Sequence, residues 1–96
     1  MGGVGCISVT ANAAPQLCAD LQAASRAGQH HIALDLHARL APLHTALFSD
    51  ASPGPVKYAL TRLIPGFPPS LRLPMTWPSP TSRAAVDAAL THAGLL

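Results

Sequence analysis

Acidic side chains are scarce in this sequence, which contains four aspartates and no glutamate. Charged residues make up only 10 % of the chain, against about 25 % in ordinary soluble domains. Intrinsic disorder is excluded, because disorder needs high charge and low hydrophobicity, and 49 % of these residues are hydrophobic. The net charge of +2 reflects the shortage of acids, and the six basic residues are scattered rather than clustered. We therefore expect no nucleic-acid partner.

Long apolar runs and cysteines are also scarce. No apolar run approaches the roughly 20 residues that span a bilayer, so we expect no membrane partner. The start of the chain carries no positive charge before its apolar stretch, which argues against a signal peptide and favours a cytoplasmic location. The only cysteines, Cys6 and Cys18, lack the spacing of metal ligands. We expect both thiols to be reduced and buried.

The chain is short and rich in apolar residues. A chain of 96 residues forms at most one small domain. Domains of this size bury about 60–65 % of the surface that the unfolded chain exposes. Because so few residues are charged, the domain must bury unusually much or expose apolar surface, and exposed apolar surface indicates a partner.

A strand is predicted near residues 4–9 (VGCISV), a nearly continuous apolar run. Such a run is typical of a strand buried on both faces in a parallel sheet. No comparable second strand follows, so its backbone donors and acceptors have no partner in this sequence. Gly2, Gly3 and Gly5 suggest a phosphate cradle, but phosphate-binding glycines follow a strand instead of preceding it. Close packing at the start of the strand is the better interpretation of these glycines.

Helical periodicity dominates the rest of the chain. A first helix over residues 14–27 would start with Pro15 and end before Gly28. A strand followed directly by this helix makes one β/α unit. The clearest pattern covers residues 29–48, with a kink expected at Pro42. Its inward side chains recur every three or four positions: Ile32, Leu36, Leu40, Leu43 and Leu47.

Two further helices are predicted around a proline-rich segment. The third helix starts at Pro55 or Val56 and stops at Pro65, and the last runs from a Ser79 cap to residue 93. Prolines in residues 66–78 forbid a regular helix, so this stretch should be extended. Its large side chains should pack over helices rather than stack on a ligand: Phe67, Met75 and Trp77. The predicted fold is α/β, mostly helical with one strand.

Few residues are candidates for catalysis. Lys57 is the only lysine, and a Schiff-base lysine needs a pKa lowered by burial and neighbours that transfer protons. Lys57 lies in the first turn of a predicted helix, and adjacent helical residues such as Tyr58 face different directions. A structural role is therefore favoured for Lys57. Ser8 and Thr10 have no evident histidine and carboxylate partners, so no nucleophilic triad is predicted.

The histidines raise the question of a metal ion. His30, His37 and His44 are seven residues apart, which is about 10 Å along a helix and too far for one ion. His31 and Asp35 are four apart, a spacing that metal ligands do use. Without a paired motif or a cysteine ligand, we favour helix histidines with no metal, and zinc-dependent helicity would contradict this. We expect no cofactor.

Five ordered segments resemble the dihydrodipicolinate synthases, also called 4-hydroxy-tetrahydrodipicolinate synthases. They are residues 2–12 (GGVGCISVTAN), 39–44 (RLAPLH), 53–60 (PGPVKYAL), 71–75 (LRLPM) and 92–96 (HAGLL). Each segment is a weak signal alone, but their order and spacing match the C-terminal third of the family. Residues 2–12 resemble the eighth strand of a TIM barrel and the loop that follows it. The residues at 50–52 and 77–78 depart from the family's usual sequence.

The resemblance implies the last β/α unit of a (β/α)8 barrel at residues 1–28 and a three-helix C-terminal extension at residues 29–96. It also implies a cytoplasmic homotetramer that condenses pyruvate with L-aspartate semialdehyde through a lysine Schiff base, in the diaminopimelate route to lysine. By resemblance, the main-chain carbonyl of Ile7 contacts the bound keto acid. Ile7 is the only substrate-binding residue that carries over, because the family's Schiff-base lysine and proton-relay tyrosine belong to earlier strands.

Two hypotheses follow from this resemblance. In the first, the chain is the C-terminal part of the synthase, a lyase, and is inactive alone, since Lys57 matches a lysine of the helical extension. In the second, it is a small helical interaction module that binds intact synthase subunits through its apolar surface. Co-purification with a full-length synthase would distinguish them.

Overall fold

The computed structural model describes residues 3–96, which form four α-helices and one short 3-10 helix. The order along the chain is η1 (Thr10–Asn12), α1 (Pro15–Arg26), α2 (His30–Ala46), α3 (Gly54–Leu63) and α4 (Pro80–His92). All four predicted helices are present, and their ends lie within a few residues of the prediction. None of the helices in the described part combines the length and hydropathy needed to span a bilayer.

The strand predicted near residues 4–9 is wrong for this chain. Residues 3–8 have no regular secondary structure, and the described residues contain no strand at all. The side chains of Val4 and Ile7 are fully exposed, at 107 % and 105 %. A β-strand is stabilised by backbone hydrogen bonds to a neighbouring strand, and residues 3–96 supply no neighbour. The apolar pattern therefore indicates a preference for a strand, but residues 3–96 contain no second strand with which it could pair.

Capping signals in the sequence explain where the helices end. Pro15 occupies the first position of α1, and Gly28 follows its last turn at a φ of +70°, which favours glycine. The Ser79 side chain accepts a hydrogen bond from the Ser82 backbone nitrogen at 3.2 Å, as expected of an N-cap before Pro80. These three helix ends therefore follow from local chemistry, independently of the missing sheet.

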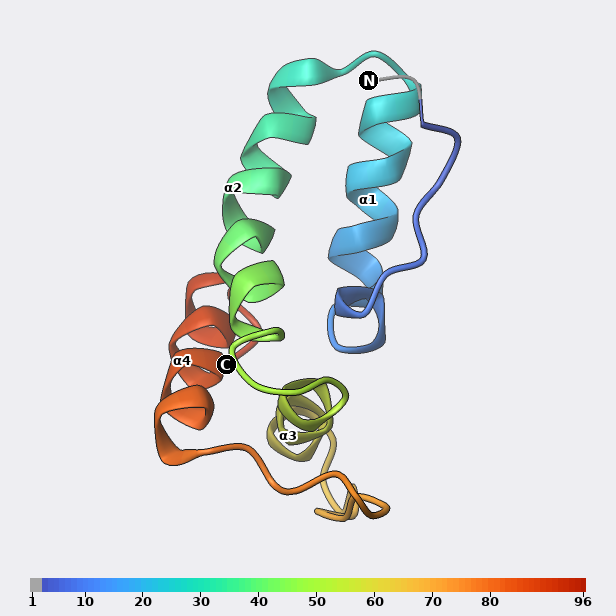
Figure 1. The fold of residues 1–96 in the computed structure, drawn as a ribbon. Helices are drawn as coiled ribbons and strands as arrows, with labels where there is room; N and C mark the ends of the chain where they lie inside the picture. Colours follow the sequence, from blue (N-terminus) through green and yellow to red (C-terminus); the bar gives the residue numbers. More distant parts are fainter. Residues whose placement is uncertain (1–2) are drawn as a thin grey trace.

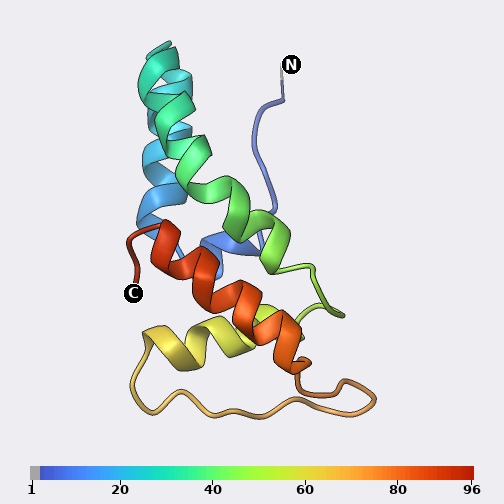
Figure 2. The same cartoon turned by 90° about the vertical axis from the view of Figure 1, so that its left-hand side faces the viewer.

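The helices build an elongated body around α2. Figure 1 shows α1 and α2 side by side and antiparallel, with α4 beside the second half of α2 and α3 across its end. The segment between α3 and α4 runs along one end of the molecule, as the perpendicular view in Figure 2 shows. That segment has no helix or strand between residues 64 and 79, as the prolines predicted.

The core lies where the second half of α2 meets α4 and η1. Leu40 and Leu43 of α2 and Leu47, directly after its last residue, are completely buried, as the periodicity predicted. Val86 and Leu90 of α4 face them and are completely buried too. The expectation fails at the N-terminal end of α2, where the predicted inward residue Ile32 is 39 % exposed. Only α1 packs against that end of α2, so its apolar face is only partly covered.

Two hydrogen bonds fasten α2 to the end of α4. The Arg39 guanidinium donates to the Ala93 carbonyl at 2.7 Å, and the His92 Nε2 lies 3.2 Å from the Ala38 carbonyl. The Ala93 carbonyl is among those that a helix leaves without a backbone partner at its C-terminus. A cation at this end also opposes the negative pole of the helix dipole.

The proline-rich segment is held against α3. The Lys57 ammonium donates to the Ser70 carbonyl at 3.1 Å. The ring of Trp77 meets the ring of Tyr58 edge to face, with centroids 6.1 Å apart. Packing over a helix is therefore confirmed for Trp77.

Candidate functional site

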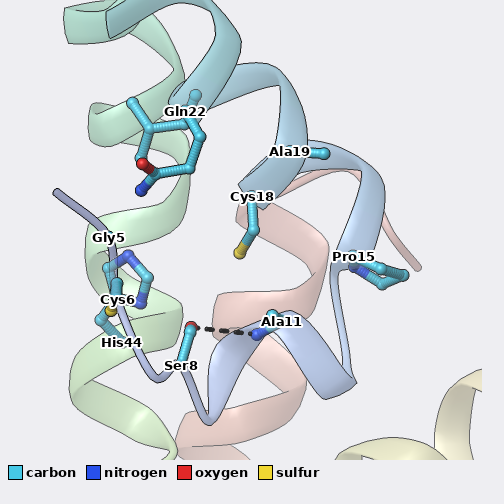
Figure 3. A pocket seen from close by; sticks show the side chains of 10 residues that line it. Gly5, Cys6, Ser8, Ala11, Pro15, Cys18, Ala19, Gln22 and His44 are labelled. Atoms are coloured by element: carbon cyan, nitrogen blue, oxygen red, sulfur yellow. Dashed lines mark hydrogen bonds between the residues drawn. The ribbon is translucent and has the colours of Figure 1, made fainter. Parts of the chain in front are cut away.

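A cavity of about 540 Å³ lies between the N-terminal segment, α1 and α2. Its lining is mostly apolar, with a few polar or sulfur-bearing side chains at its walls: Cys6, Ser8, Cys18, Gln22 and His44. Figure 3 shows the Cys18 side chain directed from α1 toward the space beside the N-terminal segment. The His44 side chain comes from α2. No aspartate is among the residues that line this cavity. The cavity can hold an apolar group but lacks the carboxylate of a nucleophilic triad.

The base of the cavity is a tight turn at residues 8–14. The Ser8 hydroxyl accepts a hydrogen bond from the Ala11 backbone nitrogen at 3.1 Å (Figure 3). The Thr10 carbonyl accepts from the Ala13 and Ala14 nitrogens at 3.0 and 2.8 Å. The Asn12 side-chain amide donates to the Val9 carbonyl at 3.1 Å. These local bonds make the turn rigid even though the segment before it has no strand partner.

One long-range hydrogen bond ties this turn to α2. The Thr10 hydroxyl and the Nδ1 of His44 are 2.7 Å apart, although 34 residues separate them in the sequence. Thr10 is buried at 2 % exposure. Burial lowers the pKa of His44 from its ordinary value, and the nearby His37 lowers it further. The neutral imidazole is therefore favoured, with one nitrogen that donates and one that accepts.

No histidine partner for Thr10 is evident from the sequence, but the structure shows that His44 is one. A signal was present, because His44 is four residues after Leu40 and three before Leu47, on the inward face of the helix. Helical periodicity places His44 on this face but cannot say which distant side chain it meets. The predicted absence of a triad is unaffected, since the lining includes no carboxylate.

The two cysteines differ in exposure. Both thiols are free, but Cys6 is exposed and Cys18 only partly covered. The expectation of a buried Cys6 is therefore wrong, because the strand that would have covered it does not form. Burial raises the pKa of the Cys18 thiol, while a hydrogen bond from Ser8 opposes the effect. Nothing within 4 Å surrounds the missing Cβ of Gly3 or Gly5, so the close packing expected there is also wrong for this chain.

Lys57 and Tyr58 do not form a catalytic pair. Lys57 holds the Ser70 carbonyl, whereas the Tyr58 hydroxyl donates to Asp87 Oδ2 on α4 at 2.8 Å. Asp87 also accepts from the Arg62 Nε at 2.9 Å. Burial raises the pKa of Tyr58, and its hydrogen bond to Asp87 raises it further. These contacts join α3 to α4 and the proline-rich segment, and they lie on different elements from the cavity.

The histidines of α2 do not converge on a metal site. Within residues 3–96, no three side chains of histidine, cysteine or aspartate gather closely enough to hold an ion. His30, His31 and His37 are exposed, whereas His44 contacts Thr10. Ile7 immediately precedes the rigid turn, with its side chain fully exposed. Its predicted contact with a keto acid is not tested by these residues.

Comparison with known proteins places this geometry in a family. The model of the dihydrodipicolinate synthetase family matches residues 1–93. The chain belongs to this family. Relatives named 4-hydroxy-tetrahydrodipicolinate synthase include those of Rhizorhabdus wittichii, 70 % identical over 99 % of the chain, and Zymomonas mobilis, 62 % identical over 100 %. The chain spans about a third of the length of these relatives, covering 33 % of each.

Solved structures of dihydrodipicolinate synthases have the same arrangement of helices. The enzyme from Thermotoga maritima is 38 % identical and superimposes with a TM-score of 0.90, over 99 % of this chain and 32 % of that one. A structure described as a monomeric dihydrodipicolinate synthase variant gives the same TM-score of 0.90 over 31 % of its length. The helical body described above is therefore a part of the synthase fold.

Proposed function

We propose that this chain is the C-terminal part of a 4-hydroxy-tetrahydrodipicolinate synthase. The single observation that carries the proposal is the 70 % identity to a synthase over 99 % of the chain, combined with coverage of only 33 % of that synthase. In the complete enzyme, residues 1–28 would supply the last β/α unit of a TIM barrel and residues 29–96 the helical extension. Residues near 4–9 would then pair with neighbouring strands and become the eighth strand.

The complete enzyme is a lyase that condenses pyruvate with L-aspartate semialdehyde in lysine biosynthesis, without a cofactor. Within it, the Ile7 carbonyl would contact the keto acid. The active site of a TIM barrel lies at the C-terminal ends of its strands, and Ile7 is near the end of the apolar run. We further propose that the enzyme is cytoplasmic and assembles as a homo-oligomer, as the family resemblance implies.

The chain alone should be inactive. A Schiff base needs an unprotonated lysine held beside groups that transfer protons. Lys57 instead donates to a main-chain carbonyl in the proline-rich segment, on an element that does not line the cavity. Incubation with pyruvate and borohydride should therefore leave Lys57 unmodified by mass spectrometry. A pyruvate adduct on Lys57 would overturn the proposed inactivity.

A direct test of the proposed function is a transplant into the Rhizorhabdus wittichii synthase. Residues 1–96 replace the matching third of that enzyme, and the chimera is assayed for condensation of pyruvate with L-aspartate semialdehyde. Activity within about tenfold of the parent supports the proposal, because substituted surfaces in a homologous core cost little when volume and pattern are kept. A soluble, folded chimera without activity contradicts it.

A second candidate function is a helical module that binds intact synthase subunits. The observation in its favour is the set of exposed large apolar side chains, including Val4, Ile7, Leu34, Phe48 and Leu73. Surfaces of this kind indicate protein partners. Purification of the tagged chain together with an untagged full-length synthase is the test. Recovery of the synthase in stable proportion supports the module, and its absence removes this alternative.

A further inference from the structure

We infer that His44 is a positioning residue for the keto acid, acting through its hydrogen bond to Thr10. This inference rests on the proposed function, in which the Ile7 carbonyl contacts the keto acid. It goes beyond that function by assigning a role to a side chain of the helical extension. The geometry that supports it is the connection from Ile7 through the turn at residues 8–14 to α2.

The first step is the short distance along the chain between Ile7 and Thr10. Only Ser8 and Val9 separate Ile7 from Thr10, and the carbonyls of Val9 and Thr10 both accept bonds inside the turn. A rotation of the turn would therefore move the Ile7 carbonyl with it. Within residues 3–96 the Ile7 side chain is fully exposed, so no side-chain packing inside this chain holds it in place.

The second step is the source of the turn's orientation. Local hydrogen bonds fix the shape of the turn but not its direction relative to the helices. The buried Thr10 hydroxyl helps to set that direction through its 2.7 Å contact with His44 Nδ1, together with Ala13 and Ala14 of the turn, which pack in the core. His44 is itself held by its place beside Leu43 and Leu47, which are completely buried. The hydrogen bond to His44 thus couples the orientation of the turn to the position of α2.

The third step concerns the chemical requirement at position 44. The contact uses Nδ1, so an asparagine amide can occupy nearly the same place, whereas leucine offers similar bulk without a polar atom. At position 10, serine keeps the hydroxyl and valine removes it while keeping the shape. Comparing His44→Leu with His44→Asn, and Thr10→Val with Thr10→Ser, therefore separates the effect of losing the hydrogen bond from the effect of changed packing.

The test uses the full-length chimera described above, with pyruvate KM, kcat and the thermal midpoint measured for each variant. His44→Leu and Thr10→Val should each raise the KM for pyruvate about tenfold, with kcat changed less than about twofold, as expected for the loss of one hydrogen bond that orients a binding group. His44→Asn and Thr10→Ser should restore the KM to within about twofold of the unchanged chimera. The double variant His44→Leu/Thr10→Val should be no worse than either single variant.

Arg39→Leu is the control for a purely structural effect. It removes the Arg39–Ala93 bond between α2 and α4, away from the cavity lining, and should lower the thermal midpoint without changing the KM for pyruvate. If His44→Leu and Thr10→Val behave like this control, the inference is overturned. It is also overturned if the asparagine and serine variants are as impaired as the leucine and valine ones. An inactive but folded unchanged chimera would instead contradict the proposed function.

Discussion

The hydroxyl of Tyr58 donates a hydrogen bond to Asp87 across the contact between α3 and α4, over 2.8 Å. Tyr58 is the only tyrosine in the sequence, so its ionisation can be followed without interference. Asp87 also accepts from Arg62 and therefore joins two side chains of α3 to one of α4.

The pKa of Tyr58 should fall when Asp87 is neutralised. Burial, the hydrogen bond to Asp87 and the negative charge of Asp87 all raise this pKa, and Asp87→Asn removes the charge while leaving the burial. Titration of the tyrosine ultraviolet absorbance should give a lower midpoint in the variant than in the parent. Asp20→Asn, on the exposed face of α1, should leave the midpoint unchanged. Equal midpoints in the Asp87→Asn variant and the parent would show that Asp87 does not raise the pKa of Tyr58.

Loss of a core leucine should strongly destabilise the fold. Leu43→Ala removes a completely buried side chain and should lower the free energy of unfolding by about 2–5 kcal/mol. Leu34→Ala, on the same helix, removes a side chain that is 65 % exposed and should change it by about 0.5 kcal/mol or less. Urea denaturation followed by circular dichroism measures both. Similar losses in the two variants would mean that the core is placed incorrectly.

Acidification should destabilise the fold through His44. The folded-state pKa of His44 is lowered by burial and by His37, so the folded chain binds a proton less readily than the unfolded chain. The resulting stability is present above about pH 6.5 and is lost as the pH falls from there through the folded pKa. The free energy of unfolding should therefore decrease between neutral pH and pH values below about 6. His44→Asn keeps a polar partner for Thr10 but cannot titrate, so this variant should show a weaker dependence over the same window.

The two thiols should react with a maleimide at different rates. Cys6 is exposed, whereas Cys18 is partly covered and burial raises its pKa, which lowers the fraction of reactive thiolate. Mass spectrometry of a time course should show Cys6 modified first. The single variants Cys6→Ser and Cys18→Ser assign each labelled product to its thiol. Faster labelling of Cys18 would contradict its partial burial on α1.

Sequence patterns were sufficient for the helices because helix signals are local. Pro15, Ser79 and the glycines at 28 and 94 mark ends that depend on one or two turns of chain, and the leucines at 40, 43 and 47 define one face. These features need no knowledge of a partner. Their success also explains why family resemblance and periodicity agreed about residues 29–96.

The strand near residues 4–9 failed for the opposite reason. A strand preference becomes a strand only when another segment accepts its backbone hydrogen bonds, and that is a property of the pair. The contact between Thr10 and His44 also depends on a distant element and could not be predicted. Periodicity indicates which face of a helix is buried but not which side chains lie against that face. The exposure of Cys6 follows from the missing strand and could not have been predicted separately.

The completely or nearly buried residues of the described chain all follow residue 9, with Thr10 the first of them. None of residues 3–8 is therefore part of the buried core of the helical body. In the complete enzyme proposed above, we expect this body to open as a cooperative unit, with a free energy separate from that of the proposed barrel strands. Amide hydrogens of α2 and α4 would then stay protected from exchange under conditions that already open the segment before Thr10.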